Sequence, residues 1–250
     1  MRYAAIYVGL LGAGIVAMSA VAQPAQAPSP VTRTVVAATK LPSVVETPLY
    51  FSALQVSIPP RETSTLSAAN GILYQLSGAT EASVGSETKM LRAGDGLFLA
   101  AGKTASLKAG SDETSILLYF LLTQGVDRNQ PAVTAPVTSK ELYHTAAPIP
   151  DLKGGSYDLN LTRVTFPAQM PLNPPHHRSG AALYYILSGT GTNSIADKTE
   201  AKGPGSWIYE PFGLVHRWGN TGDAPFTFLA FNINPEGVAA VLQGEPARGK

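Results

Sequence analysis

The feature that most constrains the fold of this chain is an internal repeat. Four of its segments return in the same order about 110 residues further along. The pairs are Val56–Pro59 with Val164–Pro167, Leu73–Gly78 with Tyr184–Gly189, Ala93–Leu99 with Lys202–Ile208, and Ser115–Phe120 with Ala224–Leu229. Four matches in one order indicate that one structural unit occurs twice.

Each repeat has the pattern of antiparallel β-structure. Short runs of β-favouring residues alternate with Gly, Ser, Thr, Asn and Asp, and no long amphipathic helical pattern occurs. With 44% apolar residues, a chain of 250 residues can bury substantial cores. We therefore predict an all-β fold made of two antiparallel barrels.

The repeat also predicts the domain organisation. We expect one barrel over residues 43–124 and a second over residues 155–250. Between them, residues 125–154 contain several prolines and read as a linker, with a short helical turn over Ser139–Tyr143. Residues 23–42 are rich in Pro, Ala and Thr, and we expect a disordered leader there.

The first 22 residues have the design of a secretory signal peptide. Arg2 precedes an apolar run that ends in Ala20-Val21-Ala22, which predicts cleavage after Ala22 and a periplasmic or secreted protein without a membrane segment. An uncleaved anchor is the alternative, because the run approaches the roughly 20 apolar residues that span a bilayer. The chain has no cysteine, so its stability depends on its cores rather than on disulfides.

Charge excludes one class of partner. Lys and Arg number 18 and Asp and Glu number 17, and no basic run with interleaved aromatic residues occurs. A nucleic-acid partner is therefore not expected.

The most specific motif lies in the second repeat. Gly205, Pro211, Gly213, His216 and Asn220 follow the spacing G-x5-P-x-G-x2-H-x3-N between two apolar runs. Glycine and proline at these intervals suit a strand, a tight turn and a second strand, with His216 where the second strand begins.

This spacing resembles the second motif of the cupin superfamily. The first motif of that family has two histidines one residue apart, a glutamate four or five residues later, and a strand that ends in glycine. The matching segment here has His176 and His177 adjacent, Ala182 at the glutamate position and Gly189 at the end. The resemblance implies two tandem cupin barrels, each a double-stranded β-helix or jelly roll, with a metal site in the second.

The candidate metal ligands are His176, His177 and His216. Imidazole suits zinc and iron, and the missing glutamate makes a manganese site less favoured, so we expect iron or zinc. Adjacent strand residues point to opposite faces, so one of His176 and His177 should face the cavity, and we expect His177. Tyr184 shares a face with Ala182 and is the candidate catalytic proton donor or substitute ligand.

Other residues near the two motifs are candidates for substrate binding. The guanidinium of Arg178 could pair with a substrate carboxylate, with a solvated loop charge as the alternative. The aromatic side chains of Trp207, Tyr209 and Trp218 could line an apolar pocket, with core packing as the alternative. Glu210 is the carboxylate nearest to the second motif.

The first repeat has lost the metal-binding residues. Aligned on Tyr74 and Tyr185, it has Thr65 and Leu66 opposite His176 and His177, and Leu107 stands opposite His216. We therefore expect the first barrel to be structural, a pairing surface or a binder of something apolar.

Two functional hypotheses follow. In the first, the second barrel holds a divalent metal and acts on a small organic molecule, by oxygenase, isomerase or lyase chemistry. In the second, the protein is a non-catalytic cupin that binds a small ligand or serves as a scaffold without metal. The family resemblance also implies pairing through sheets, which two copies in a homodimer or the two barrels of one chain could provide.

Overall fold

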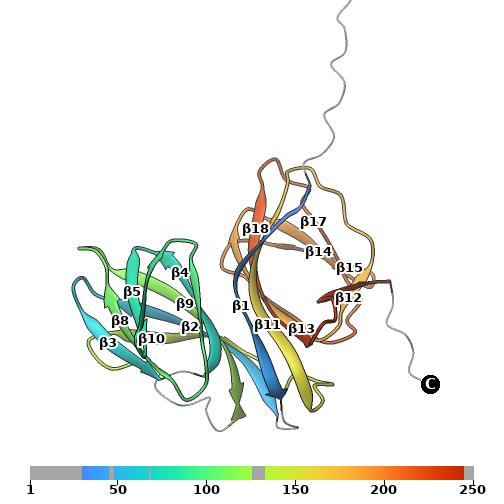
Figure 1. Ribbon diagram of the computed structural model, residues 1–250. Coiled ribbons are helices and arrows are strands. Elements are labelled where there is room, and N and C mark those ends of the chain that lie inside the picture. The colour runs from blue at the N-terminus through green and yellow to red at the C-terminus, as the bar shows by residue number, and fades with distance from the viewer. Residues whose placement is uncertain (1–29, 45–47, 68, 126–132, 245–250) are drawn as a thin grey trace, which may run out of the picture.

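The computed structural model describes residues 30–44, 48–67, 69–125 and 133–244, which form two β-barrels (Figure 1). The first barrel combines a five-stranded and a four-stranded sheet. The five-stranded sheet has the order β10 (Thr138–His144), β2 (Leu49–Ile58), β9 (Ser115–Gln124), β4 (Asn70–Ser77) and β7 (Gly96–Leu99). The four-stranded sheet has the order β3 (Thr63–Ser67), β8 (Thr104–Ala109), β5 (Ala79–Val84) and β6 (Glu87–Arg92).

The second barrel repeats this plan. Its five-stranded sheet has the order β1 (Thr32–Val44), β11 (Gly155–Phe166), β18 (Phe226–Pro235), β13 (Ala181–Ser188) and β16 (Trp207–Glu210). The opposing layer has three strands, β15 (Lys198–Lys202), β14 (Gly191–Ile195) and β17 (Arg217–Gly219), and a pair, β12 (His176–Arg178) with β19 (Val241–Gln243). All of these pairings are antiparallel, and the predicted all-β jelly-roll fold is confirmed.

In each five-stranded sheet, one edge strand comes from the chain segment that directly precedes the other barrel. β1 pairs with β11 of the second barrel, and β10 pairs with β2 of the first (Figure 1). The predicted disordered leader is therefore wrong for residues 32–42, and the helical turn expected over Ser139–Tyr143 is a strand. Each strand covers an edge of β2 or β11 that would otherwise present unpaired backbone groups.

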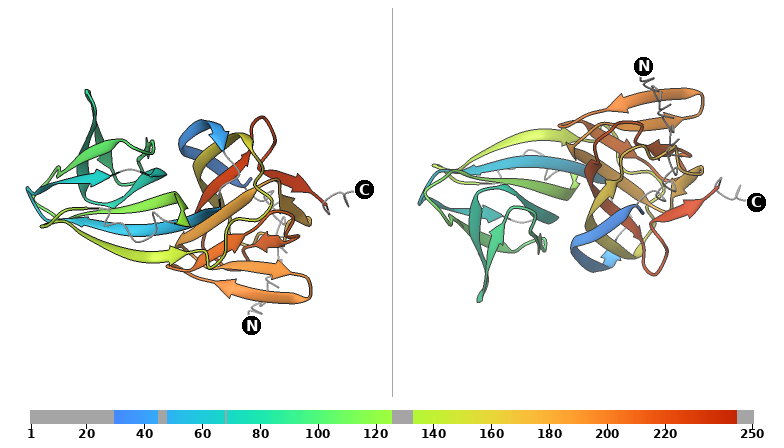
Figure 2. Two further views of the ribbon diagram at one scale, coloured as in Figure 1. Left: turned by 90° about the horizontal axis from the view of Figure 1, so that it is seen from below. Right: turned by 90° about the horizontal axis from the view of Figure 1, so that it is seen from above.

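The outer faces of the two five-stranded sheets pack against each other, so the barrels lie side by side (Figure 2). Phe51 and Phe120 of the first barrel contact Phe231 of the second, with ring centroids 5.4 and 5.7 Å apart. β9 and β18 are consequently buried on both faces. Burial on both faces explains why both strands read as nearly continuous apolar runs rather than as alternating patterns.

The predicted signal peptide, residues 1–22, lies outside the described residues, so export remains a prediction. Within the described part of the chain, no helix has the length and hydropathy needed to cross a bilayer.

Candidate functional site

A cavity of about 610 Å³ lies in the second barrel. Alternate residues of β18 shape it: Phe228, Ala230, Asn232 and Asn234 line the cavity, while the residues between them face the other barrel. The remaining lining comes from β1, β11, β12, β13, β17, β19 and adjoining loops, and includes Arg33, Lys40, Asp158, Asn160, Val164, Phe166, His176, Arg178, Tyr184, Trp218 and Ala240. The cavity thus has an aromatic and aliphatic floor with amides and charged groups around it.

The alternation of side chains along β12 determines which histidine faces the cavity. His176 and Arg178 line it, whereas His177 between them does not and has its Nδ1 2.9 Å from the carbonyl oxygen of Gly244. The expectation that His177 points inward is therefore wrong, and His176 is the inward residue. Two backbone hydrogen bonds, of 3.1 and 2.9 Å, join His176 to His216 and fix this register.

The imidazoles of His176 and His216 meet, with ring centroids 4.3 Å apart. The Nδ1 of His176 lies 3.0 Å from the carbonyl oxygen of Pro174, and that of His216 lies 2.8 Å from the oxygen of Leu214. A carbonyl oxygen can only accept, so both Nδ1 atoms carry hydrogen. Burial lowers the pKa of His176, which favours a neutral ring whose Nε2 is an acceptor.

Glu210 is the centre of a buried polar cluster and is itself fully buried. Its Oε2 accepts a hydrogen bond of 2.8 Å from Nε of Arg178, and its Oε1 accepts one of 2.8 Å from Nε1 of Trp218. Nε2 of His216 lies 3.0 Å from Oε1, close enough for an ion pair when the ring is protonated but not aligned for a hydrogen bond. Burial would raise the pKa of Glu210, yet the charge of Arg178 with the contacts to His216 and Trp218 holds it at about 2.

Sequence reasoning missed the role of Glu210, although it noted the residue. Glu210 on β16 pairs directly with Ala182 on β13, so its carboxylate comes from the strand beside the position where the first motif has glutamate. Strand alternation was the available signal, because Glu210 follows Trp207 by three residues and therefore points to the opposite face.

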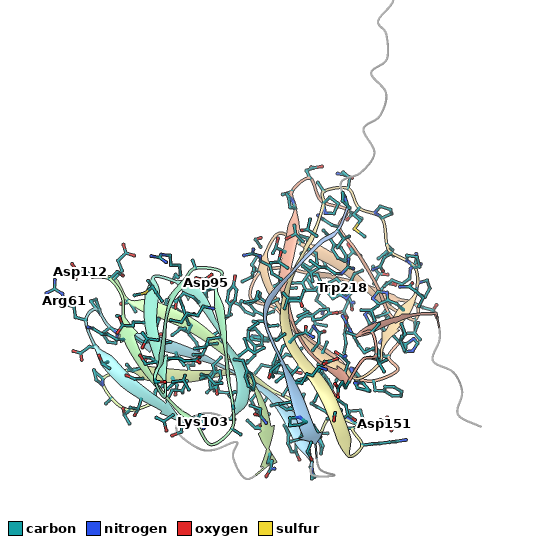
Figure 3. All side chains as sticks on the ribbon, viewed as in Figure 1. Arg61, Asp95, Lys103, Asp112, Asp151 and Trp218 are labelled. Carbon is teal, nitrogen blue, oxygen red and sulfur yellow. The ribbon has the colours of Figure 1, made fainter. Side chains whose placement is uncertain are left out.

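The other predicted site residues divide between two places. Arg178, Tyr184 and Trp218 line the cavity, and the guanidinium carbon of Arg178 lies 5.1 Å from the centroid of the Tyr184 ring. Trp218 lies inside the second barrel, as Figure 3 shows. The predicted substrate contacts of Trp207 and Tyr209 are wrong: both rings pack between the barrels, 5.7 Å from Phe120 and 6.0 Å from Phe51 respectively.

The cross-strand pairing shows which residues of the two repeats correspond, and it corrects the alignment made from the sequence. His216 is bridged to His176, and in the first barrel Ala105 pairs with Leu66 in the same manner. Trp218 pairs with Asn193 as Leu107 pairs with Ala82, so Leu107 corresponds to Trp218 rather than to His216.

Comparisons with known proteins agree with this architecture. Residues 162–232 match the family model "Cupin domain" (Cupin_2). No curated protein matches the chain in sequence. The match to the family model lies within the second barrel, and the two jelly-roll barrels of the chain have the cupin fold.

Solved structures share the fold at low sequence identity. AerE from Microcystis aeruginosa is 18% identical, with 72% of this chain and 86% of that chain covered and a TM-score of 0.51. The putative glyoxylate induced protein from Pseudomonas aeruginosa is 12% identical, with 77% of each chain covered and a TM-score of 0.51. A variant of the salicylate 1,2-dioxygenase from Pseudoaminobacter salicylatoxidans, in complex with gentisate, is 10% identical, with coverage of 75% and 69% and a TM-score of 0.51.

Proposed function

We propose that the second barrel binds a small organic anion in its cavity. The observation that carries this proposal is Arg178, a buried guanidinium that lines a cavity with an apolar floor. Two further cationic side chains, Arg33 and Lys40, line the same cavity, with Asp158 as the lining carboxylate and Lys40 also paired with Glu236. An anionic head group with an apolar body complements this combination of charge and floor.

The polar side chains around Arg178 would orient such a ligand. Nη1 of Arg178 lies 3.4 Å from Oδ1 of Asn232, whose Nδ2 donates to Oδ1 of Asn160 at 2.9 Å. This chain of contacts holds the guanidinium in place, so little side-chain entropy would be lost when an anion binds. The ring of Tyr184 lies beneath the guanidinium and restricts it further.

Proton transfer to or from the bound ligand is a second candidate function. It is favoured by His176, which lines the cavity and whose lowered pKa and Nδ1 contact leave Nε2 free to accept a proton. Tyr184, our predicted proton donor, lines the same cavity. The iron or zinc chemistry predicted from three histidines is less well supported, because only His176 and His216 meet and an arginine lies beside them.

The experiment is a thermal-shift and calorimetric titration of chelator-treated protein with paired probes. Benzoate and benzamide, and aliphatic acids with their amides, differ mainly in charge. We expect acids to raise Tm and amides to have no effect, because only the acids can pair with Arg178. Equal responses to acid and amide, or no response to any acid, would contradict the proposal.

A cavity-blocking variant locates the binding site. Ala240→Trp adds bulk at a lining residue just before β19, and we expect it to weaken acid binding by roughly tenfold or more. Ala201→Trp, on the exposed strand β15, is the matched control and should bind as the wild type does.

We also propose that the protein is exported, on the pattern of residues 1–22 alone. N-terminal sequencing of the mature chain after expression in a bacterium with its own secretion system tests this. A mature chain that begins at Gln23 supports export, and one that retains Met1 argues against it.

A further inference from the structure

The residue that lies where this cupin site would have its second histidine is Arg178. Because β12 alternates, His176 and Arg178 both line the cavity, one residue apart, and Ala182 follows four residues later. The segment therefore has the spacing of the first motif with arginine in place of the second histidine and alanine in place of glutamate. Two of its three ligand positions cannot bind a metal ion.

We propose that the guanidinium of Arg178 replaces the metal ion as the fixed positive charge of this site, and that Glu210 supplies its carboxylate from the neighbouring strand. A carboxylate that is fully buried needs a counter-charge, and Arg178 provides it at 2.8 Å. The cation is thus covalently part of the chain, and the site needs no ion from solution.

Both carboxylate oxygens of Glu210 are already engaged by protein groups. Oε2 accepts from Arg178, and Oε1 accepts from Trp218 and faces Nε2 of His216. A divalent ion bound between the imidazoles would also stand close to the guanidinium, where like charges repel. Among the residues that the structure describes, no group of three or more His, Cys, Asp or Glu side chains is placed to hold a metal.

The proposal predicts that a metal site can be recovered by one substitution. Arg178→His removes the cation and adds an imidazole beside those of His176 and His216, next to Oε2 of Glu210, which loses its partner. Three imidazoles and a carboxylate suit zinc and other divalent ions. We therefore expect this variant to be less stable than the wild type in chelator and to regain stability when zinc is added.

The test compares Tm values of three untagged proteins in EDTA and in excess ZnCl₂ or MnCl₂. Wild type should show no difference, and Arg178→His should gain roughly 5–10 °C at a metal concentration about 100-fold above its Kd. Arg178→Gln is the matched control, because it loses the same charge without adding a ligand, and it should be destabilised and remain so. Metal analysis should find one ion per chain in Arg178→His only.

Two outcomes would overturn the proposal. One is wild-type protein that purifies with a stoichiometric metal ion and loses stability in EDTA, a measurement that needs no variant to fold. The other is Arg178→His and Arg178→Gln responding alike to metal. Both readouts are independent of organic ligands. A failed acid titration would therefore contradict the proposed anion binding but not the replacement of the metal ion by Arg178, and a failed metal test would leave the anion-binding proposal intact.

Discussion

The two barrels share one backbone plan but differ in what fills them. In the first barrel the inward positions hold Leu66, Leu73, Leu99, Ala105 and Leu107, all with at most 1% exposure. Their counterparts in the second barrel, by cross-strand pairing and repeat alignment, are His176, Tyr184, Glu210, His216 and Trp218, respectively. Aliphatic side chains fill one interior, and polar and aromatic ones surround a cavity in the other.

This difference indicates that the barrel fold does not depend on the polar residues of the second interior. The first barrel keeps the same strand order and the same register with no ionisable group at any of these five positions. The polar cluster of the second barrel is therefore not needed for this strand arrangement, which favours a functional role for it over a structural one. Substitutions that make one interior resemble the other are the direct test of this view.

The largest expected effect comes from giving the second barrel the leucine of the first at position 210. Glu210→Leu leaves Arg178 buried without its partner, and we expect a loss of about 3–5 kcal/mol in the free energy of unfolding. Adding Arg178→Met should recover most of that loss, because both charges are then replaced by apolar groups. Urea denaturation measures both values, and a single variant that costs less than about 1 kcal/mol would refute the pairing.

A pair of alanine substitutions at equivalent positions should sharpen the comparison. Leu66→Ala creates a void in a filled interior and should cost about 3 kcal/mol. His176→Ala enlarges an existing cavity and removes one hydrogen bond to a carbonyl, so about 1 kcal/mol is expected. Ligand binding should show the opposite order, with His176→Ala impaired and Leu66→Ala unchanged. Equal costs of unfolding would mean that the second interior is packed as tightly as the first.

The second barrel should also be the more sensitive to acid. Burial alone would raise the pKa of Glu210, but the charge of Arg178 together with the contacts to His216 and Trp218 outweighs burial and lowers the pKa to about 2 in the folded state. Its contribution, on the order of 3 kcal/mol, is therefore fully present above the ordinary value of 4.5 and is lost as the pH falls from there towards 2.

Denaturation curves between pH 6 and pH 3 should consequently converge for wild type and Glu210→Gln, since the variant lacks this titration. Glu87→Gln, an exposed carboxylate of the first barrel, serves as the control for the substitution itself. A constant stability gap across this range would show that Glu210 does not titrate with folding.

Much of this architecture could be predicted from the sequence, because repeated strands and glycine turns are local signals. Gly205 has a φ of 81°, as expected of a glycine at a turn, and Asn220 donates to the carbonyls of Pro167 and Ala224. The place of β1 as an edge strand of the second barrel was missed because Thr32–Val44 is largely exposed and has little apolar pattern. Its pairing with β11, more than a hundred residues away, orders it, together with the packing of Leu41 and Val44 into the core between the sheets.

The site was harder to predict for a related reason. Histidines were found by residue type, but their direction depends on the pairing of β12 with β19 and of His176 with His216, which are contacts distant in sequence. Trp207 and Tyr209 were misjudged because β16 belongs to a sheet with packed side chains on both faces. Aromatic residues on either face of such a sheet look alike in sequence.

The smallest expected effect concerns the histidine that we first expected to face the cavity. His177→Ala removes a buried ring and its contact with the carbonyl of Gly244, which should cost about 1 kcal/mol of stability or less. The affinity for organic acids should stay within about twofold of the wild type, since His177 does not line the cavity. His176→Ala, one residue earlier on β12, is the matched comparison and should weaken acid binding by roughly tenfold. If the two variants exchanged these effects, β12 would be turned over in solution, and Arg178 would leave the cavity together with His176.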